Sequence, residues 1–376
     1  MASAENLRPL HGAQALRAEL ECLGQVWTLL GCACDIPAKD DWFRATLGGR
    51  SVFIQRFEDG LRGFENRCAH RSCPLRTEER GKGPMVCGFH QKRYDKEGVA
   101  AGIPICRDAY GVEPRALNQR LTRLDVEQCG ALVFMRFAGG ADTGLLAGFL
   151  GPAFPIIALL CADMRGAAKA SLPTAANWRL SQQISLDDDH SPAVHPASFG
   201  RRGHPPREAL DYHRFGPHSA YFLGATSGAM EAMAKALGER KLEAPTYRIL
   251  HIFPNSLISL MTVTRPFGWP FRYVLIQCRI PLAFDRSETR FRISRHRADA
   301  VSPSLLHRLV ALADPLLLVL VRLALVHFVK EDRAICGGLQ RNARQIQPRP
   351  AYAQHEMRVA RFDEAFAAAM RERDGQ

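Results

Sequence analysis

Two cysteine–histidine pairs stand in the first third of the chain. Cys68 and His70 occur in NRCAHRSCPL, and Cys87 and His90 occur in VCGFHQKRYD. Two thiolates and two imidazoles could bind a tetrahedral zinc ion, but zinc modules usually pair cysteine with cysteine and histidine with histidine. One thiolate and one imidazole from each segment suit a two-iron cluster, with both cysteines on one iron and both histidines on the other. We therefore expect a [2Fe–2S] cluster here.

The residues around both pairs resemble the two binding loops of Rieske [2Fe–2S] domains, over about residues 40–140. Rieske proteins of respiratory complexes carry one more cysteine in each loop, and these two cysteines form a disulfide. This chain has Cys73 in the first loop but Phe89 in the matching place of the second, so we expect Cys73 to be a small buried residue near the cluster. Many relatives have Gly-Trp after the second histidine. This chain has Gln91-Lys92, and Lys92 is expected to alter the docking surface around the cluster.

A second set of candidate ligands lies in NWRLSQQISLDDDHSPAVHP, residues 177–196. His190 and His195 are five positions apart, which on one straight helix would place them away from a common face. Because a helix tends to end just before a proline, Pro192 should end the helix at His190 and leave His195 in the following turn, where the two can converge. Two histidines and one carboxylate bind non-haem Fe(II) and leave positions open for oxygen and substrate.

The whole layout resembles the catalytic (alpha) subunit of Rieske non-haem iron oxygenases, the family of ring-hydroxylating dioxygenases and related monooxygenases and demethylases. In that family, the first part of the iron site along the sequence is Asn-Trp followed by Asp-x2-His-x4-His. The matching residues are Asn177-Trp178, then Asp187, His190 and His195. The resemblance extends over nearly the entire chain.

The resemblance also implies a third iron ligand and a carboxylate that connects the two metal centres. The third ligand, an aspartate in a C-terminal helix, matches Asp332 in KEDRAICGGLQ, with Glu331 as the neighbouring competitor. Asp187 precedes His190 by three positions, so on a helix the two side chains share a face. In the family, this aspartate bridges the iron-site histidine to a cluster histidine of the adjacent subunit.

The implied function is an oxygenation that uses O2 and electrons from NAD(P)H. No dinucleotide fingerprint occurs in the sequence, so the electrons should come from a separate reductase, with or without a ferredoxin. The expected cofactors are one [2Fe–2S] Rieske cluster and one mononuclear non-haem Fe(II) per chain, and the expected assembly is a homotrimer. Hydroxylation or oxidative demethylation of a small, largely apolar, aromatic molecule is favoured over cis-dihydroxylation because the chain is short.

Two alternatives stay open at this point. A Rieske electron-transfer protein, whose large domain only docks partners, would need none of His190, His195 and Asp332. A substrate-binding module that holds zinc in place of the cluster would show no visible absorbance.

The substrate itself is not encoded in any motif. Pocket walls are expected from residues 200–300, where SLISLMTV and GWPFRYVLIQ are apolar and where Arg201 or Arg202 could meet a carboxylate. Relatives often have an acidic residue followed by Asn before the Asp of the iron motif, whereas this chain has Gln183-Ile184. An apolar group is therefore expected near the iron site.

Composition limits the classes of partner and compartment. Lys plus Arg number 50 and Asp plus Glu number 38, a net charge of +12 that suits an acidic electron donor. The sequence has no basic run with interleaved aromatic residues, so nucleic-acid binding is not expected. Eleven cysteines without an even framework, and no signal peptide at the N-terminus, predict a cytoplasmic protein with free or metal-binding thiols. The apolar run 315–329 is shorter than the about 20 residues of a membrane helix, so we expect a buried helix and no membrane span.

The predicted fold class is α+β, and its elements must bring the candidate metal ligands together. Short strand-like runs with turn signals between Trp42 and Phe137 predict a small antiparallel β domain. Strand-like runs then alternate with helical stretches, which predicts an antiparallel sheet with packed helices, and the resemblance implies a helix-grip, START-like form. The predicted parts are an N-terminal segment 1–40 that packs on the catalytic domain, a Rieske domain 41–138, a linker 138–144, and a catalytic domain 145–376 with helices at 177–190, 226–238 and 304–345.

Overall fold

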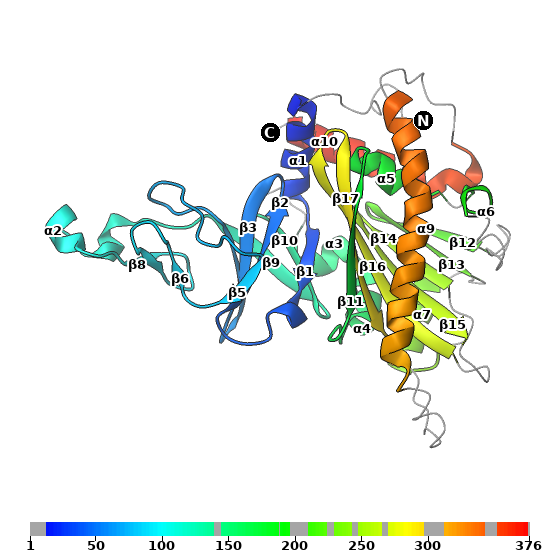
Figure 1. Cartoon of the computed structure of the whole chain (residues 1–376), viewed down its shortest axis with the longest axis horizontal. Helices are drawn as coiled ribbons and strands as arrows, with labels where there is room; N and C mark the ends of the chain where they lie inside the picture. Colours follow the sequence, from blue (N-terminus) through cyan, green and yellow to red (C-terminus); the bar gives the residue numbers. More distant parts are fainter. Residues whose placement is uncertain are drawn as a thin grey trace. The chain divides into compact units, whose positions relative to one another are not determined.

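The structure is a computed structural model with two compact units. It describes residues 13–138, 144–187, 189–195, 210–223, 229–242, 247–264, 270–296, 312–342 and 352–374. Residues Glu19–Leu146 form one unit, and Ala147–Gln376 together with Met1–Ala18 form the other. Each unit carries one of the two candidate metal sites, and Figure 1 shows the strands and helices of each.

The unit Glu19–Leu146 is built on a seven-stranded antiparallel sheet in the order β1-β10-β9-β4-β3-β2-β5. Its strands are β1 (Thr28–Cys32), β2 (Asp41–Leu47), β3 (Arg50–Phe57), β4 (Gly60–Glu65), β5 (Arg80–Lys82), β9 (Arg123–Cys129) and β10 (Leu132–Phe137). Gly48 and Gly49 both have positive φ, 55° and 73°, as a tight turn between β2 and β3 requires. Alternate residues of these strands, among them Val52, Ile54 and Val133, form the core of the sheet.

A three-stranded sheet in the order β6-β7-β8 carries the second cysteine–histidine pair. It consists of β6 (Met85–Val86), β7 (Arg93–Tyr94) and β8 (Ala100–Gly102), and it is followed by the helices α2 (Cys106–Tyr110) and η3 (Pro114–Leu117). The first pair lies between β4 and β5, and the second between β6 and β7. A core that includes Phe53, Phe64 and Met85 packs against both cysteines of these pairs.

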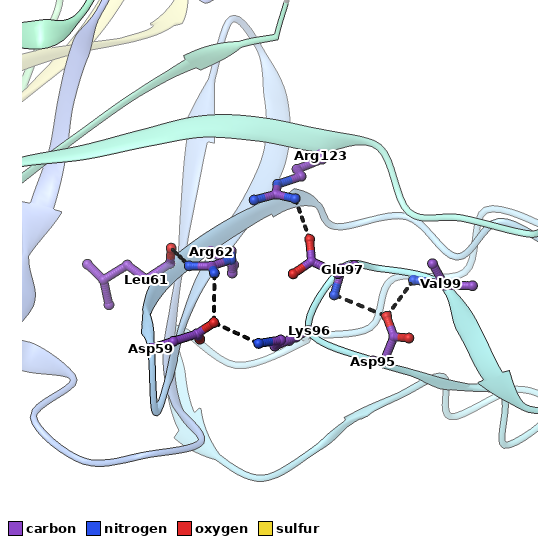
Figure 2. A network of polar contacts seen from close by, with 8 residues as sticks. All are labelled: Asp59, Leu61, Arg62, Asp95, Lys96, Glu97, Val99 and Arg123. Carbon is purple, nitrogen blue, oxygen red and sulfur yellow. Dashed lines mark hydrogen bonds and ion pairs between the residues drawn. The ribbon is translucent and has the colours of Figure 1, made fainter.

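A network of surface ion pairs holds the turn that follows β7 (Figure 2). Asp59 accepts hydrogen bonds from Arg62 at 3.0 Å and from Lys96 at 2.7 Å, and Arg123 of β9 pairs with Glu97. A single exposed ion pair contributes at most about 1 kcal/mol. Together, the pairs connect the turn 95–98 to the β3–β4 hairpin and to β9. They thereby fix the position of β7, the strand that follows the second cysteine–histidine segment.

The start of the chain departs from two expectations. β1 pairs with β10, so residues 28–32 belong to this sheet and not to a segment that packs on the catalytic domain. Cys32 and Cys34 form a disulfide with a Cα–Cα distance of 5.2 Å, so the expectation of free thiols is wrong for this pair. The functional boundaries 41–138 and 145–376 stay predictions.

The second unit contains another seven-stranded antiparallel sheet, in the order β11-β17-β16-β15-β14-β13-β12. Its strands are β11 (Ala168–Thr174), β12 (Leu210–Phe215), β13 (His218–Leu223), β14 (Tyr247–Ile252), β15 (Ser256–Thr264), β16 (Pro270–Ala283) and β17 (Arg286–Arg295). Sheets of purely antiparallel strands with helices packed on them confirm the predicted α+β class.

The second unit also contains the following helices, some of which pack on its sheet. They are α1 (Ala13–Gln25), α3 (Leu146–Leu150), α4 (Ala153–Leu160), α5 (Trp178–Ile184), α6 (Ser191–Val194), α7 (Ala229–Gly238), α9 (Asp314–Asn342), η7 (Gln354–Glu356) and α10 (Met357–Asp374), of which α1 and α3 extend across the limits of the unit. α9 contacts β11 and β17, α5 contacts α9 and β16, and α10 contacts β12 and β13. Figure 1 shows α9 in orange running along the sheet.

The helix predicted to be buried at 315–329 is only partly buried. Within α9, Val321 and Val329 pack on Phe271 and Leu275 of β16. On its other side, residues such as Leu320 are exposed, in this case by 53%. A single helix lying on a sheet buries one stripe of side chains, so an all-round apolar run leaves the rest uncovered. No helix within the described ranges combines the length and apolar character needed to cross a membrane.

Candidate functional site

The first cysteine–histidine segment folds into a tight turn closed by the backbone. Cys68 N–H donates to the carbonyl of Cys73 at 2.9 Å, and Ser72 N–H donates to the carbonyl of Cys68 at 3.0 Å. Ser72 has a φ of 59°. The buried side chain of Asn66 anchors the turn, because its Oδ1 accepts the N–H of Arg76 at 2.8 Å and its Nδ2 donates to the carbonyl of the same residue at 2.7 Å.

The second segment forms the same turn, with the same two backbone hydrogen bonds. Cys87 N–H donates to the carbonyl of Lys92 at 2.9 Å, and Gln91 N–H donates to the carbonyl of Cys87 at 3.0 Å. Gln91 has a φ of 54°, a conformation that glycine adopts more readily. Lys92 is buried and its Nζ donates to Oε1 of Gln119 at 2.6 Å. The expectation that Lys92 alters the docking surface is therefore wrong, because the side chain that faces solvent here is Gln91.

The four candidate cluster ligands are arranged in two layers. Cys68 and Cys87 are buried, whereas His70 and His90 are exposed. The Nδ1 atoms of the two histidines lie 3.3 Å apart. Two nitrogens bound at about 2.1 Å to one tetrahedral metal are about 3.4 Å apart. The arrangement therefore fits a cluster with an inner iron on two thiolates and an outer iron on two imidazoles.

Neighbouring groups adjust the charge around these ligands. The hydroxyl of Tyr94 lies 3.0 Å from Sγ of Cys68. Burial, and next the hydrogen bond to Cys68, raise the pKa of Tyr94, so its hydroxyl stays protonated and donates to the sulfur. Desolvation, and next the positive charge of Lys92, lower the pKa of His70. A lower pKa favours the neutral imidazole, which is the form that binds metal.

The extra cysteine of the first loop and the phenylalanine at the matching place of the second loop also have defined places. Cys73 is half-buried and packs against the core beside the cysteine ligands, so it is less buried than expected. Phe89 is exposed, and its ring lies 3.9 Å from the ring of His90, centroid to centroid. An exposed aromatic ring therefore flanks one of the two outer ligands.

The second candidate site lies in the other unit, where the structure brings His190, His195 and Asp332 together. One ligand atom from each lies within 4.8 Å of the others. Oδ1 of Asp332 is 2.9 Å from Nε2 of His195 and 3.4 Å from Nε2 of His190. Oδ1 of Asp332 and Nε2 of His195 are buried without a hydrogen-bond partner, although buried polar atoms normally have one. Two imidazoles and a carboxylate are the ligand set of non-haem Fe(II), so these residues fit such an ion.

The local fold that positions the two histidines differs from the prediction. α5 ends at Ile184, and α6 (Ser191–Val194) is a separate short helix with His190 as its N-cap and His195 as its C-cap. Pro192 lies in the first turn of α6, where a proline is tolerated because that N–H has no helical partner. Pro192 therefore begins the second helix, and the prediction that it ends the first is wrong.

Glu331 contacts the side of His195 that faces away from Asp332. Its Oε2 lies 2.7 Å from Nδ1 of His195, and the ring of Phe328 stacks on the same imidazole with centroids 3.7 Å apart. A carboxylate at Nδ1 holds the proton on that nitrogen and leaves Nε2 free to bind a metal. Glu331 thus orients a candidate ligand, and its carboxylate is not at the place where the three ligand atoms meet.

Asp187 approaches His190 without forming the expected hydrogen bond. Its Oδ2 is 3.9 Å from Nδ1 of His190, and its Oδ1 accepts the backbone N–H of Asp189 at 2.9 Å. Burial lowers the pKa of His190, but the negative charges of Asp332 and Asp187 raise it by more, so the net shift is upward. The carboxylate of Asp187 is one-third exposed and available to a partner outside the chain.

α5 is tied to the helix that carries Asp332. Asn177 caps α5 by accepting the N–H of Arg179 at 2.8 Å, and its own N–H donates to Gln340 of α9 at 2.8 Å. Of the two residues that depart from the family pattern, Gln183 donates to Asp363 at 2.7 Å and Ile184 packs on α9. The apolar group expected near the iron site is thus part of the contact between α5 and α9.

Two buried polar side chains were not anticipated from the sequence. Arg279 of β16 and Gln182 of α5 are both almost completely buried, and each has polar atoms without a partner. The signal for Arg279 was its charge in the mainly apolar run FRYVLIQCRI, which also contains Arg272. Gln182 stands in no pattern that marks it. The arginines that were anticipated, Arg201 and Arg202, lie outside the described residues.

Each of the two units contains a region that matches a known protein family. A family model described as the Rieske [2Fe-2S] domain matches residues 26–116, and one described as the ring hydroxylating alpha subunit (catalytic domain) matches residues 161–372. The glycine betaine monooxygenase oxygenase subunit of Chromohalobacter salexigens is 27% identical over 179 residues, which are 45% of this chain and 38% of that protein. The anthranilate 1,2-dioxygenase large subunit of Burkholderia cepacia is 29% identical over 189 residues, 46% of this chain and 42% of that protein. The chain thus spans about two fifths of the length of these curated relatives.

Solved structures agree with the fold. Naphthalene 1,2-dioxygenase from Rhodococcus sp. bound to indole has a TM-score of 0.74 at 18% identity, covering 98% of this chain and 94% of that one. The catalytic-domain family uses a mononuclear non-haem iron, and the Rieske domain binds a [2Fe–2S] cluster. Because the catalytic-domain model matches more than half of the residues, the chain belongs to the ring-hydroxylating alpha subunits, with a Rieske domain ahead of their catalytic domain.

Proposed function

We propose that this chain is an oxygenase that uses O2 and NAD(P)H-derived electrons to hydroxylate or oxidatively demethylate a small organic molecule. The observation that carries the proposal is the buried group of His190, His195 and Asp332, with ligand atoms within 4.8 Å, in a chain that also has a Rieske domain. An electron carrier would need only the Rieske domain. A second metal site with open positions is what oxygen activation requires.

The roles of individual residues follow from their places. We assign Cys68, Cys87, His70 and His90 to the cluster, and His190, His195 and Asp332 to the mononuclear iron. When bound, the iron supplies oxygen activation and the cluster supplies electrons one at a time. Glu331 keeps the proton of His195 on Nδ1. The apolar side chains that α9 and β16 share keep water away from the inner face of the sheet.

The electron donor is proposed to be a separate reductase, with or without a ferredoxin. Electrons can enter at the exposed rings of His70 and His90, and the net charge of +12 favours an acidic donor. Reduced thiols at the free cysteines fit the cytoplasm as the working compartment.

Cis-dihydroxylation of an aromatic ring is the second candidate reaction. The fold is shared with a naphthalene 1,2-dioxygenase, and the relatives by sequence include both a monooxygenase and an anthranilate dioxygenase. Both reactions use the same metal ligands, so the product and not the site distinguishes them.

A single turnover tests the oxygenase proposal without a natural donor. Protein that is reduced chemically, freed of reductant and exposed to 18O2 with a panel of aromatic and quaternary ammonium compounds should oxidise its cluster and yield a labelled product, detected by mass spectrometry. One labelled oxygen in the organic product supports hydroxylation, two support dihydroxylation, and a demethylated product with release of formaldehyde supports demethylation. Oxidation of the cluster with no labelled product from any compound, in protein that binds no mononuclear iron, would leave the electron carrier as the function.

We further propose that the working form is a homotrimer in which Asp187 connects His190 to a cluster histidine of a neighbouring copy. The one-third exposed carboxylate and the unpartnered Nδ1 of His190 support this assignment. A closed ring of copies in head-to-tail contact would supply the neighbour.

Asp187→Asn should keep both metal centres but slow the oxidation of the reduced cluster in a single turnover by about 10- to 100-fold, because the bridging carboxylate is lost. Stopped-flow absorbance of the cluster measures this rate. Asp189→Asn is the matched control, since that carboxylate pairs with His355. A normal rate in Asp187→Asn, or a fully active monomer, contradicts the bridge.

A further inference from the structure

Arg279 is a buried cation without a carboxylate partner. It is 2% exposed, and its Nη2 donates to Oγ of Ser185 and to Oε1 of Gln277 at 3.0 Å. Its Nε and Nη1 are buried and have no hydrogen-bond partner in the part of the chain that the structure describes. Within the described ranges, no carboxylate forms an ion pair with it at 4.0 Å or less. Burial lowers the pKa of Arg279 to about 10, so the guanidinium is still charged at neutral pH.

The guanidinium lies on the side of the sheet that faces the candidate iron site. Phe271, Tyr273 and Leu275 of β16 pack with α9, and Arg279 has the same strand parity as these residues. Arg279 reaches Ser185 at the end of α5, and the preceding Ile184 packs on Cys336, one helical turn from Asp332 on α9. The charge of Asp332 favours the charged form of Arg279, and an ion bound to Asp332 would share that negative charge.

Gln182 adds a second unsatisfied group near the same place. Its side chain is fully buried, and neither its amide nitrogen nor its amide oxygen has a hydrogen-bond partner among the described residues. Gln182 precedes Ser185 by three positions at the end of α5, so the two lie on one side of that helix. Buried donors and acceptors in native proteins are normally paired. A cation and an amide that are both left unpaired on the inner side of the unit indicate a polar ligand.

We propose that Arg279 anchors a carboxylate group of the substrate, with Gln182 as an additional polar contact, so that the substrates are small organic anions. This inference rests on the proposed oxygenase function and narrows its substrate class. A carboxylate offers charge-assisted hydrogen bonds to the free N–H groups of the guanidinium.

Binding of matched pairs of compounds tests the anchor. The probes are benzoate, salicylate and phenylacetate, each beside its uncharged amide, and calorimetric titration of the full chain measures their affinities without electron donor. The carboxylates should bind about tenfold or more tighter than their amides, and Arg279→Gln should remove this preference. Arg290→Gln, an exposed arginine on the neighbouring strand, should keep it.

A second variant does not depend on how well Arg279→Gln folds. Ser185→Asp places a carboxylate of the protein at the guanidinium, so it should raise the unfolding temperature of the ligand-free chain and abolish binding of the carboxylates. Ser185→Asn has the same size without the charge and should still bind them. Equal affinity for carboxylates and amides, no binding of any of the three carboxylates, or binding that survives in both Arg279→Gln and Ser185→Asp overturns the anchor.

The same titrations separate this inference from the oxygenase proposal. They need neither oxygen nor electrons, and they are repeated after a chelator has removed the mononuclear iron. A carboxylate preference in a chain that forms no labelled product contradicts the oxygenase alone. If only uncharged compounds yield labelled product and the chain shows no preference for carboxylates, the carboxylate anchor at Arg279 is contradicted and the oxygenase proposal is not.

Discussion

Asp332→Ala is expected to lose the mononuclear iron and all oxygenation, while the visible spectrum of the Rieske cluster remains that of the unaltered chain. Oδ1 of Asp332 is the atom that faces both histidine Nε2 atoms, at 2.9 and 3.4 Å. Two imidazoles alone hold Fe(II) poorly, because the carboxylate supplies the only negative charge of the ligand set. Iron per chain, measured by elemental analysis, should fall by one, and 18O incorporation should fall to the background.

The neighbouring acid provides the control for this result. Glu331→Gln keeps an acceptor oxygen within reach of Nδ1 of His195, so iron should still bind, with an affinity lowered by about 10- to 100-fold. Retained iron and retained activity in Asp332→Ala would show that Glu331 or another carboxylate is the ligand. The assignment of Asp332 would then be wrong.

Cys68→Ser is expected to abolish the cluster and the red-brown colour of the protein. Cys68 is buried, and a serine hydroxyl is a far weaker ligand than a thiolate for an iron that prefers sulfur. The same loss is expected for His90→Ala, which removes one of the two outer nitrogens. Visible absorbance and acid-labile sulfide measure the cluster, and far-UV circular dichroism checks that the chain is still folded.

Cys73→Ser is the matched control in the same loop. Cys73 supplies its backbone carbonyl to the turn, and its half-buried sulfur donates to the carbonyl of Pro74 at 3.7 Å. The cluster spectrum should therefore be unchanged. An unchanged spectrum in Cys68→Ser, or a lost one in Cys73→Ser, contradicts the ligand assignment.

Both candidate ligand sets could be proposed from the sequence because most of their members lie close together in the chain. Cys68 and His70 lie within one short turn, as do Cys87 and His90, so their spacing follows from the turn itself. Tertiary packing has little freedom to separate residues this close in the chain. The α+β class followed for a similar reason, since the alternation of strands and turns is also a local signal.

The remaining parts of the site depend on contacts between distant segments. That Arg279 reaches Ser185 depends on the register of β16 and on where α5 ends, neither of which a pattern of residue types specifies. The same is true of Glu331, whose pairing with His195 requires α9 to present two successive acids to opposite edges of one site. The exposed side of α9 was missed because hydrophobicity shows that a side chain favours burial, but not whether another element is there to cover it.

The contact between His195 and Glu331 joins positions that are 136 residues apart in the chain. An ion held by His195 and Asp332 would join nearly the same two positions, and would act as a cross-link between α6 and α9. A ligand that binds only the folded chain stabilises it in proportion to the logarithm of its concentration, and the closed loop is long enough for its entropy to be large. Iron bound at this site would therefore also stabilise the C-terminal third of the protein. Chelators that remove it should make α9 more accessible to proteases.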